Sequence, residues 1–198
     1  MNDNDNPENN PNRPSVEQIN TELDRRVTWQ EVKKAIIDTV KNLIVIAAAA
    51  VLVANLVISV VIVSRSSMNP TLYDGEVIVS LRWTSAKPGD IIVFYYNNNI
   101  LMKRVIAKEG DWVNISDDGT VYVNEKALDE PYITEKSLGE CDIEMPYQVP
   151  DGSVFVMGDN RKTSADSRLR DIGPVKTENI VGKAFLRIWP LTKISYIG

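Results

Sequence analysis

Residues 43–63 read LIVIAAAAVLVANLVISVVIV, and none of them is charged. A helix needs about 20 apolar residues to cross the hydrocarbon core of a bilayer. A charge-free run of this length is rare in the core of a soluble domain. It also exceeds the apolar region of about 7–15 residues that a cleavable signal peptide carries. We therefore expect a single N-terminal transmembrane helix within residues 36–63.

The end of this run changes in character. Residues 60–63 are Val, Val, Ile and Val, and β-branched side chains favour strands over helices. We expect the helix to occupy roughly residues 38–59 and the chain then to enter its first strand.

Basic residues flank the run unevenly, and this predicts its orientation. Those before it are Arg25, Arg26, Lys33, Lys34 and Lys41, and those within a comparable distance after it are Arg65 and Arg82. The excess of Lys and Arg marks the cytoplasmic side of a membrane helix. We expect a single-pass protein of the cell membrane with a cytoplasmic N-terminus and with residues 64–198 outside the cytoplasm.

The segment before the run is polar. Residues 1–14, MNDNDNPENNPNRP, contain too little apolar surface to bury, which predicts disorder. Ser15 and Gln18 have the spacing of a capping box, so residues 15–35 could form a short polar helix, the alternative being an irregular solvated segment. We interpret residues 1–35 as a disordered or polar cytoplasmic tail.

The remainder reads as a mostly β domain. Alternating or β-branched runs bounded by turn residues predict strands at residues 76–83, 90–96, 100–106, 113–116, 120–124, 153–157 and 180–189. Asp117-Asp118-Gly119 between two of these runs is a hairpin signal. Short strands joined by frequent turns favour an antiparallel β-sheet domain over residues 64–198.

Composition excludes several kinds of chemistry. The chain has no histidine and one cysteine, Cys141, which excludes Ser-His-Asp catalysis, HExxH zinc sites and an internal disulfide. We expect no cofactor and no metal. A formal net charge of −5 also argues against nucleic acid as a partner. A serine nucleophile would need another base, and a desolvated lysine is the usual substitute.

Two segments could carry such chemistry. In the strand around Lys103, Leu101 and Val105 share its face, so burial would favour the neutral amine; a lysine that reaches solvent is the alternative. The segment SRSSMNPT at residues 64–71 is rich in hydroxyl groups, but Ser and Thr next to Pro also form ordinary turns.

Taken together, the motifs resemble a known family. After the membrane run come SMNPTL at 67–72, KR at 103–104 in an apolar strand, and GDNRKTSADSR at 158–168. This order is similar to the bacterial type I signal peptidases, or leader peptidases, which are membrane-bound Ser/Lys serine proteases that cleave signal peptides from exported preproteins.

The resemblance implies a role for each matched residue. Ser67 matches the nucleophile, Lys103 the general base, and Ser164 the serine that orients the lysine amine by a hydrogen bond. Charged residues with a structural role near the site are matched by Arg104, Asp159, Asp166 and Arg168. The implied substrate is an extended signal peptide with small residues at the first and third positions before the cut, and the implied second partner is the lipid bilayer.

One position departs from the family pattern. Two residues before the nucleophile, where some members have a serine that contributes to the oxyanion hole, this chain has Arg65. Arg65 could supply charge, contact lipid phosphates or extend into solvent. This departure leaves open an inactive membrane-anchored β domain that binds exported chains. A self-cleaving repressor would lack the membrane run and is disfavoured.

Overall fold

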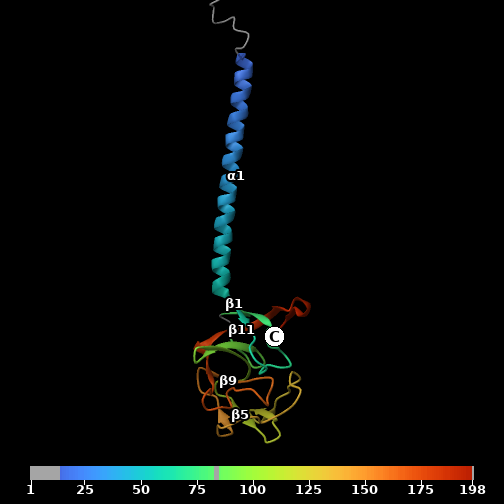
Figure 1. The fold of residues 1–198 in the computed structure, drawn as a ribbon. Coiled ribbons are helices and arrows are strands. Elements are labelled where there is room, and N and C mark those ends of the chain that lie inside the picture. The colour runs from blue at the N-terminus through green and yellow to red at the C-terminus, as the bar shows by residue number, and fades with distance from the viewer. Residues whose placement is uncertain (1–13, 83–84, 198) are drawn as a thin grey trace, which may run out of the picture. The chain divides into compact units, whose positions relative to one another are not determined.

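The computed structural model describes residues 14–82 and 85–197, and Figure 1 shows the fold. The chain divides into two compact units, Met1–Val53 and Ala54–Gly198. Residues 1–13, to which the prediction of disorder applies, lie outside the described part, as does the end of the strand predicted at residues 76–83.

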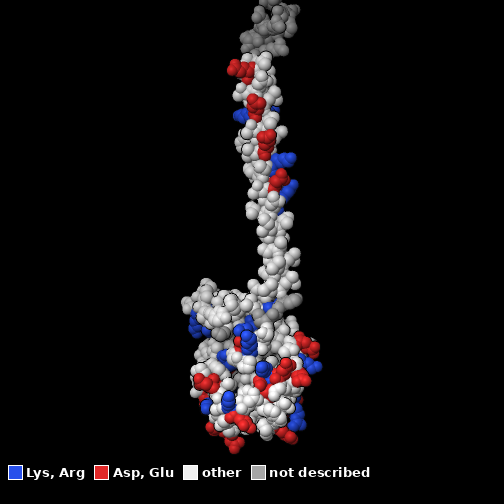
Figure 2. Space-filling model, turned by 180° about the vertical axis from the view of Figure 1, so that it is seen from behind, with Lys and Arg blue, Asp and Glu red and all other residues white. Residues whose placement is uncertain are grey.

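Helix α1, Val16–Val57, is one continuous helix. Its start is a capping box, in which Gln18 N–H donates to Ser15 Oγ (3.2 Å) and Ser15 N–H donates to Gln18 Oε1 (3.0 Å). The helix suggested for residues 15–35 and the apolar helix expected at 38–59 are therefore one element. The charged side chains of α1 gather on its N-terminal part, and the rest is apolar (Figure 2).

Within the described residues, α1 is the one helix long and apolar enough to cross a membrane. Strand β1, Ile58–Ile62, begins directly after it, two residues earlier than expected. The reason is pairing, since all five residues of β1 align antiparallel with β2, Val77–Leu81.

The larger sheet is antiparallel in every pairing between its described strands. Its order is β1-β2-β11-β3-β4-β9-β10, and β12 pairs with β11. The bounds not yet given are β3 Ile91–Tyr96, β4 Asn99–Lys108, β9 Ser153–Met157, β10 Val175–Lys176, β11 Ile180–Trp189 and β12 Ser195–Tyr196. Two 3₁₀ helices flank β11, η2 Thr177–Asn179 and η3 Leu191–Lys193.

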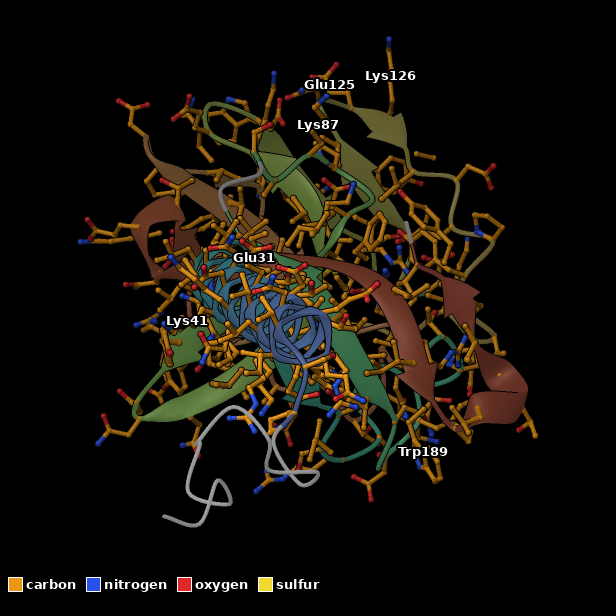
Figure 3. The ribbon with its side chains drawn as sticks, turned by 90° about the horizontal axis from the view of Figure 1, so that it is seen from above. Glu31, Lys41, Lys87, Glu125, Lys126 and Trp189 are labelled. Carbon is orange, nitrogen blue, oxygen red and sulfur yellow. The ribbon has the colours of Figure 1, made fainter. Side chains whose placement is uncertain are left out.

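The smaller sheet has the order β7-β6-β5-β8. Its strands are β5 Trp112–Ile115, β6 Val121–Val123, β7 Lys126–Ala127 and β8 Tyr147–Gln148. The predicted hairpin at residues 117–119 is confirmed, with Val113 opposite Val123 and Gly119 at φ +83°. At the β6–β7 turn, Glu125 and Lys126 point outward (Figure 3). The mostly antiparallel β fold is thus confirmed.

An apolar cluster positions the segment that follows β1. Met68 and Leu72 are fully buried and pack with Ile91, Val93 and Met102 of the central strands. Burying side chains of this size stabilises the fold by about 1.5–3 kcal/mol each. The turn that carries Ser67 is therefore fixed to strands β3 and β4 by its own apolar residues.

Candidate active site

Ser67 lies in a tight turn, residues 66–72, which we call the nucleophile turn after the role that the sequence motif predicts for Ser67. Asn69 N–H donates to the Ser66 carbonyl (3.1 Å), and Leu72 N–H donates to the Met68 carbonyl (3.0 Å). Since Met68 and Leu72 point into the core, the turn leaves the Ser67 side chain partly exposed.

Lys103 reaches this serine from strand β4. Lys103 lies opposite Ile92 of β3 and is 3% exposed. Its Nζ lies 2.7 Å from Ser67 Oγ. Burial is the largest cause that lowers the pKa of Lys103 from 10.5 to about 8; the carboxylates of Asp166 and Asp159 oppose the shift. An amine with this pKa is neutral in about a tenth of the molecules at pH 7, far more often than an ordinary lysine.

Arg104, the next residue on β4, points to the opposite face and forms a buried ion pair. Its Nε and Nη2 donate to Asp159 Oδ1 (2.8 Å) and Oδ2 (2.7 Å), and its Nη1 donates to the Gly89 carbonyl (2.7 Å). Asp159 also accepts a hydrogen bond from Thr71 Oγ1 (2.5 Å). This pair therefore links strand β4 to the nucleophile turn.

Asp166 and Arg168 form a second, fully buried pair. Arg168 Nε and Nη2 donate to the two Asp166 oxygens, each at 2.8 Å. Asp166 Oδ2 also accepts the Gly158 N–H (2.9 Å). The remaining Arg168 donors bind main-chain carbonyls, among them Leu138 at 2.6 Å. Because every donor is matched, this charge pair can be tolerated inside the protein.

Ser164 is buried close to the site, but its expected hydrogen bond to the Lys103 amine is not made. Its Oγ has no hydrogen-bond partner among the described residues. The space between Ser164 and the nucleophile turn is narrow. A Cβ at Gly158 would lie 2.5 Å from the Ser67 carbonyl oxygen and closer still to Ser164 Oγ.

Asn160 holds the main chain on both sides of Ser67 Cα. Its N–H donates to the Ser67 carbonyl (3.0 Å), and its Nδ2 donates to the Ser66 carbonyl (3.2 Å). The Ser67 N–H has no acceptor within the described part of the chain. It is thus available to a ligand oxygen.

Arg65 has an unusual backbone conformation for a residue with a side chain. Its φ is +71°, a region that favours glycine, and its N–H donates to Asp74 Oδ1 (2.7 Å). The side chain is exposed and forms no hydrogen bond or ion pair with the described residues. Its charge acts on Lys103 in the direction of a lower pKa.

Sequence reasoning missed the partners of Arg161, a residue quoted in the GDNR motif without a role. Arg161 forms a buried bidentate pair with Glu130 (2.5 and 3.1 Å), and Tyr132 donates to Glu130 (3.0 Å). No local pattern marks Glu130 or Tyr132, because Glu130 lies 31 positions from Arg161 in the sequence. Among the described residues, no group of His, Cys, Asp and Glu is placed to hold a metal ion.

Comparison with known proteins gives consistent matches. The sequence profile of the family described as signal peptidase, peptidase S26, matches residues 36–189. Signal peptidase I of Bacillus licheniformis is 33% identical over 175 residues, which cover 82% of this chain and 93% of that protein. Thylakoidal processing peptidase 1 of Arabidopsis thaliana is 36% identical over 150 residues, or 67% of this chain, and the match spans 42% of its length.

A solved structure of signal peptidase I from Enterococcus faecalis also matches. It is 31% identical, the match covers 50% of this chain and 97% of that one, and the TM-score is 0.42.

Proposed function

The chain belongs to the signal peptidase family of S26 peptidases, and from this membership we propose that it cleaves signal peptides from exported preproteins as a membrane-anchored Ser/Lys endopeptidase. The observation that carries this proposal is the distance of 2.7 Å between Lys103 Nζ and Ser67 Oγ. A weak nucleophile within hydrogen-bond reach of a desolvated base is the arrangement that covalent catalysis requires.

The proposed reaction is acyl transfer in two steps. The neutral Lys103 amine takes the proton of Ser67 Oγ as the oxygen attacks the substrate carbonyl. The resulting ammonium group then gives that proton to the leaving amine, which frees the mature protein and leaves the signal peptide as an ester on Ser67. A water molecule, deprotonated by the same amine, hydrolyses the ester.

The developing oxyanion needs hydrogen-bond donors. The Ser67 N–H supports this role, since it has no acceptor within the described residues, and a donor of this kind contributes about 10²–10³-fold to the rate. Arg65 stands where some family members have a second, hydroxyl donor. We therefore assign one oxyanion donor, the Ser67 N–H.

The substrate in this proposal is an extended peptide with small side chains at the first and third positions before the cut. Alternate side chains of an extended chain point to the same side, so two such positions would face the enzyme together. An extended chain can also hydrogen-bond along a strand.

The bilayer is the second proposed partner, with the N-terminus cytoplasmic and the β domain on the other side. Beyond α1, an apolar sheet face supports membrane contact: Ile62 pairs with Val77, which pairs with Trp189. Trp189 lies at the periphery of the sheet (Figure 3). Other exposed apolar residues on β1, η3 and the adjoining chain are Ile58, Val60, Leu191, Ile194 and Tyr196. Large exposed apolar faces mark contact surfaces, and Trp and Tyr favour the lipid–water interface.

The test is cleavage of a purified preprotein by the detergent-solubilised full chain. Ser67→Ala and Lys103→Ala are each expected to lower kcat by at least about 10⁴-fold, because each removes one half of a unit that acts together.

Matched controls are Ser64→Ala, an exposed serine of the same segment, and Lys108→Ala, an exposed lysine of the same strand; both should cleave as the wild type does. Circular dichroism establishes that the four variants are folded. Cleavage by a folded Ser67→Ala protein at a rate near that of the wild type would refute the assignment.

A further inference from the structure

The ion pair between Glu130 and Arg161 is buried without contact to Ser67 or Lys103. The side chains are 2% and 0% exposed, and Arg161 Nη1 and Nη2 each bind one Glu130 oxygen. Two such charges inside a protein gain little net stability over apolar residues of the same size. Their position relative to the site is therefore the informative feature.

Arg161 is tied to the loop that holds the nucleophile. We call residues 158–161 the clamp loop. Arg161 Nε donates to the Gly158 carbonyl (3.0 Å) at its start. In its middle, Asn160 binds the carbonyls of Ser66 and Ser67. A shift of the guanidinium group would therefore disturb this loop and the hydrogen bonds that it makes on both sides of Ser67 Cα.

Tyr132 connects this pair to the second link. Its hydroxyl donates to Glu130 Oε1 (3.0 Å), and its ring centroid lies 3.9 Å from the guanidinium carbon of Arg104. Arg104 in turn holds Asp159, which accepts from Thr71 of the nucleophile turn. Both connections to the nucleophile turn therefore meet at one short segment, residues 130–132.

We propose that Glu130 and Tyr132 are positioning residues, which fix the clamp loop against the nucleophile turn through Arg161 and Arg104. The inference rests on the proposed Ser67–Lys103 reaction. Neither residue touches the reacting atoms. Their loss should therefore disturb the alignment of Ser67 with Lys103 and with the substrate carbonyl, and leave the affinity for the peptide unchanged.

The experiment measures kcat and KM for preprotein cleavage, together with Tm, in the detergent-solubilised full chain. Glu130→Gln keeps the shape of the side chain and removes its charge. It is expected to lower kcat by about 10–100-fold and to leave KM within about twofold of the wild-type value. A loss of this size is what a misplacement of the reacting groups by about 1 Å produces. Glu130→Asp should recover part of the loss. Tyr132→Phe, which removes one hydrogen bond, should lose less kcat than Tyr132→Leu, which also removes the ring over Arg104.

Three further variants separate an effect on positioning from an effect on stability. Val121→Ala shortens a buried side chain of the apolar cluster beneath the smaller sheet; it should lower Tm while kcat stays at the wild-type value. Glu130→Leu combined with Arg161→Met removes both charges, so it should recover Tm relative to Glu130→Leu alone without recovering kcat.

Wild-type kcat in Glu130→Gln would overturn the proposal, and so would recovery of kcat together with Tm in the double variant. Ser67→Ala, measured alongside, keeps the two claims apart. Activity retained in Ser67→Ala refutes the proposed function, whereas loss of activity in Ser67→Ala with normal activity in the Glu130 and Tyr132 variants refutes the positioning role alone.

Discussion

In the proposed reaction, the ionisation of the Lys103 side chain sets the pH dependence of cleavage. Only the neutral amine can take the serine proton, so below its pKa of about 8 kcat/KM should fall about tenfold per pH unit. We expect a plateau above this midpoint, which lies well below the ordinary lysine value. Rates of preprotein cleavage between pH 6 and 10 measure it, and a rate that still rises about tenfold per pH unit up to pH 10 would contradict a desolvated base.

The same shift should appear in stability. Between pH 8 and 10.5 the unfolded chain binds the Lys103 proton and the folded chain does not, so the free energy of unfolding should rise with pH across this window.

Arg65 tests the electrostatic contribution to the pKa of Lys103, since its charge lowers that pKa. Arg65→Ala should move the activity limb to higher pH, and Arg65→Lys should leave it in place. An unmoved limb in Arg65→Ala would exclude this effect.

Sequence motifs identify the site residues that belong to them, but not the residues that act through tertiary contacts. Ser67, Lys103 and the four charged residues follow from SMNPTL, KR and GDNRKTSADSR. Glu130 and Tyr132 sit in an unremarkable loop, and only folding brings them to Arg161 and Arg104. The hydrogen bond expected of Ser164 is also absent, because a motif fixes the identity of a residue and not its rotamer.

At the scale of elements, the longer strands were predictable because each one presents an apolar run between turn residues. The two-residue strands β7, β8, β10 and β12 were not. Each is too short to show a period, and each exists through its pairing with a longer neighbour. The sequence predicted two separate segments where α1 is a single helix, because the residues change from polar to apolar while the backbone continues without a break.

The close approach of two loops at Gly158 leads to a prediction at the scale of elements. A methyl group there would meet the Ser67 carbonyl oxygen and Ser164 Oγ, and the main-chain oxygen cannot yield without moving the nucleophile. Gly158→Ala is therefore expected to lower the free energy of unfolding by about 1–3 kcal/mol and to lower kcat as well. Denaturant titration and preprotein cleavage measure the two effects.

Gly152→Ala is the control. Gly152 has φ +67° and no neighbouring atom within 4 Å of the added carbon, so its substitution strains the backbone away from the site. It should lower stability by about 1–2 kcal/mol with kcat unchanged. If Gly158→Ala cleaved as fast as the wild type, the packing of the two loops would have no bearing on Ser67.

At the scale of the whole molecule, the chain combines an apolar helix with a β unit that has its own core. The second compact unit starts at Ala54 and includes β1, which pairs along its length with β2. A fragment of residues 54–198 should therefore fold, whereas a fragment that begins at residue 63 lacks β1 and should be less stable.

The helix then has one expected contribution, which is to hold enzyme and preprotein in the same membrane. Confining two partners raises their effective concentration, by about 10²–10⁴-fold when the geometry allows both to engage. The fragment of residues 54–198 should thus cleave a short soluble peptide with the kcat/KM of the full chain, but should cleave a preprotein in lipid vesicles more slowly by about that factor. An equal loss on both substrates would mean that residues 1–53 support the site itself, and no loss on vesicles would mean that anchoring does not limit the reaction.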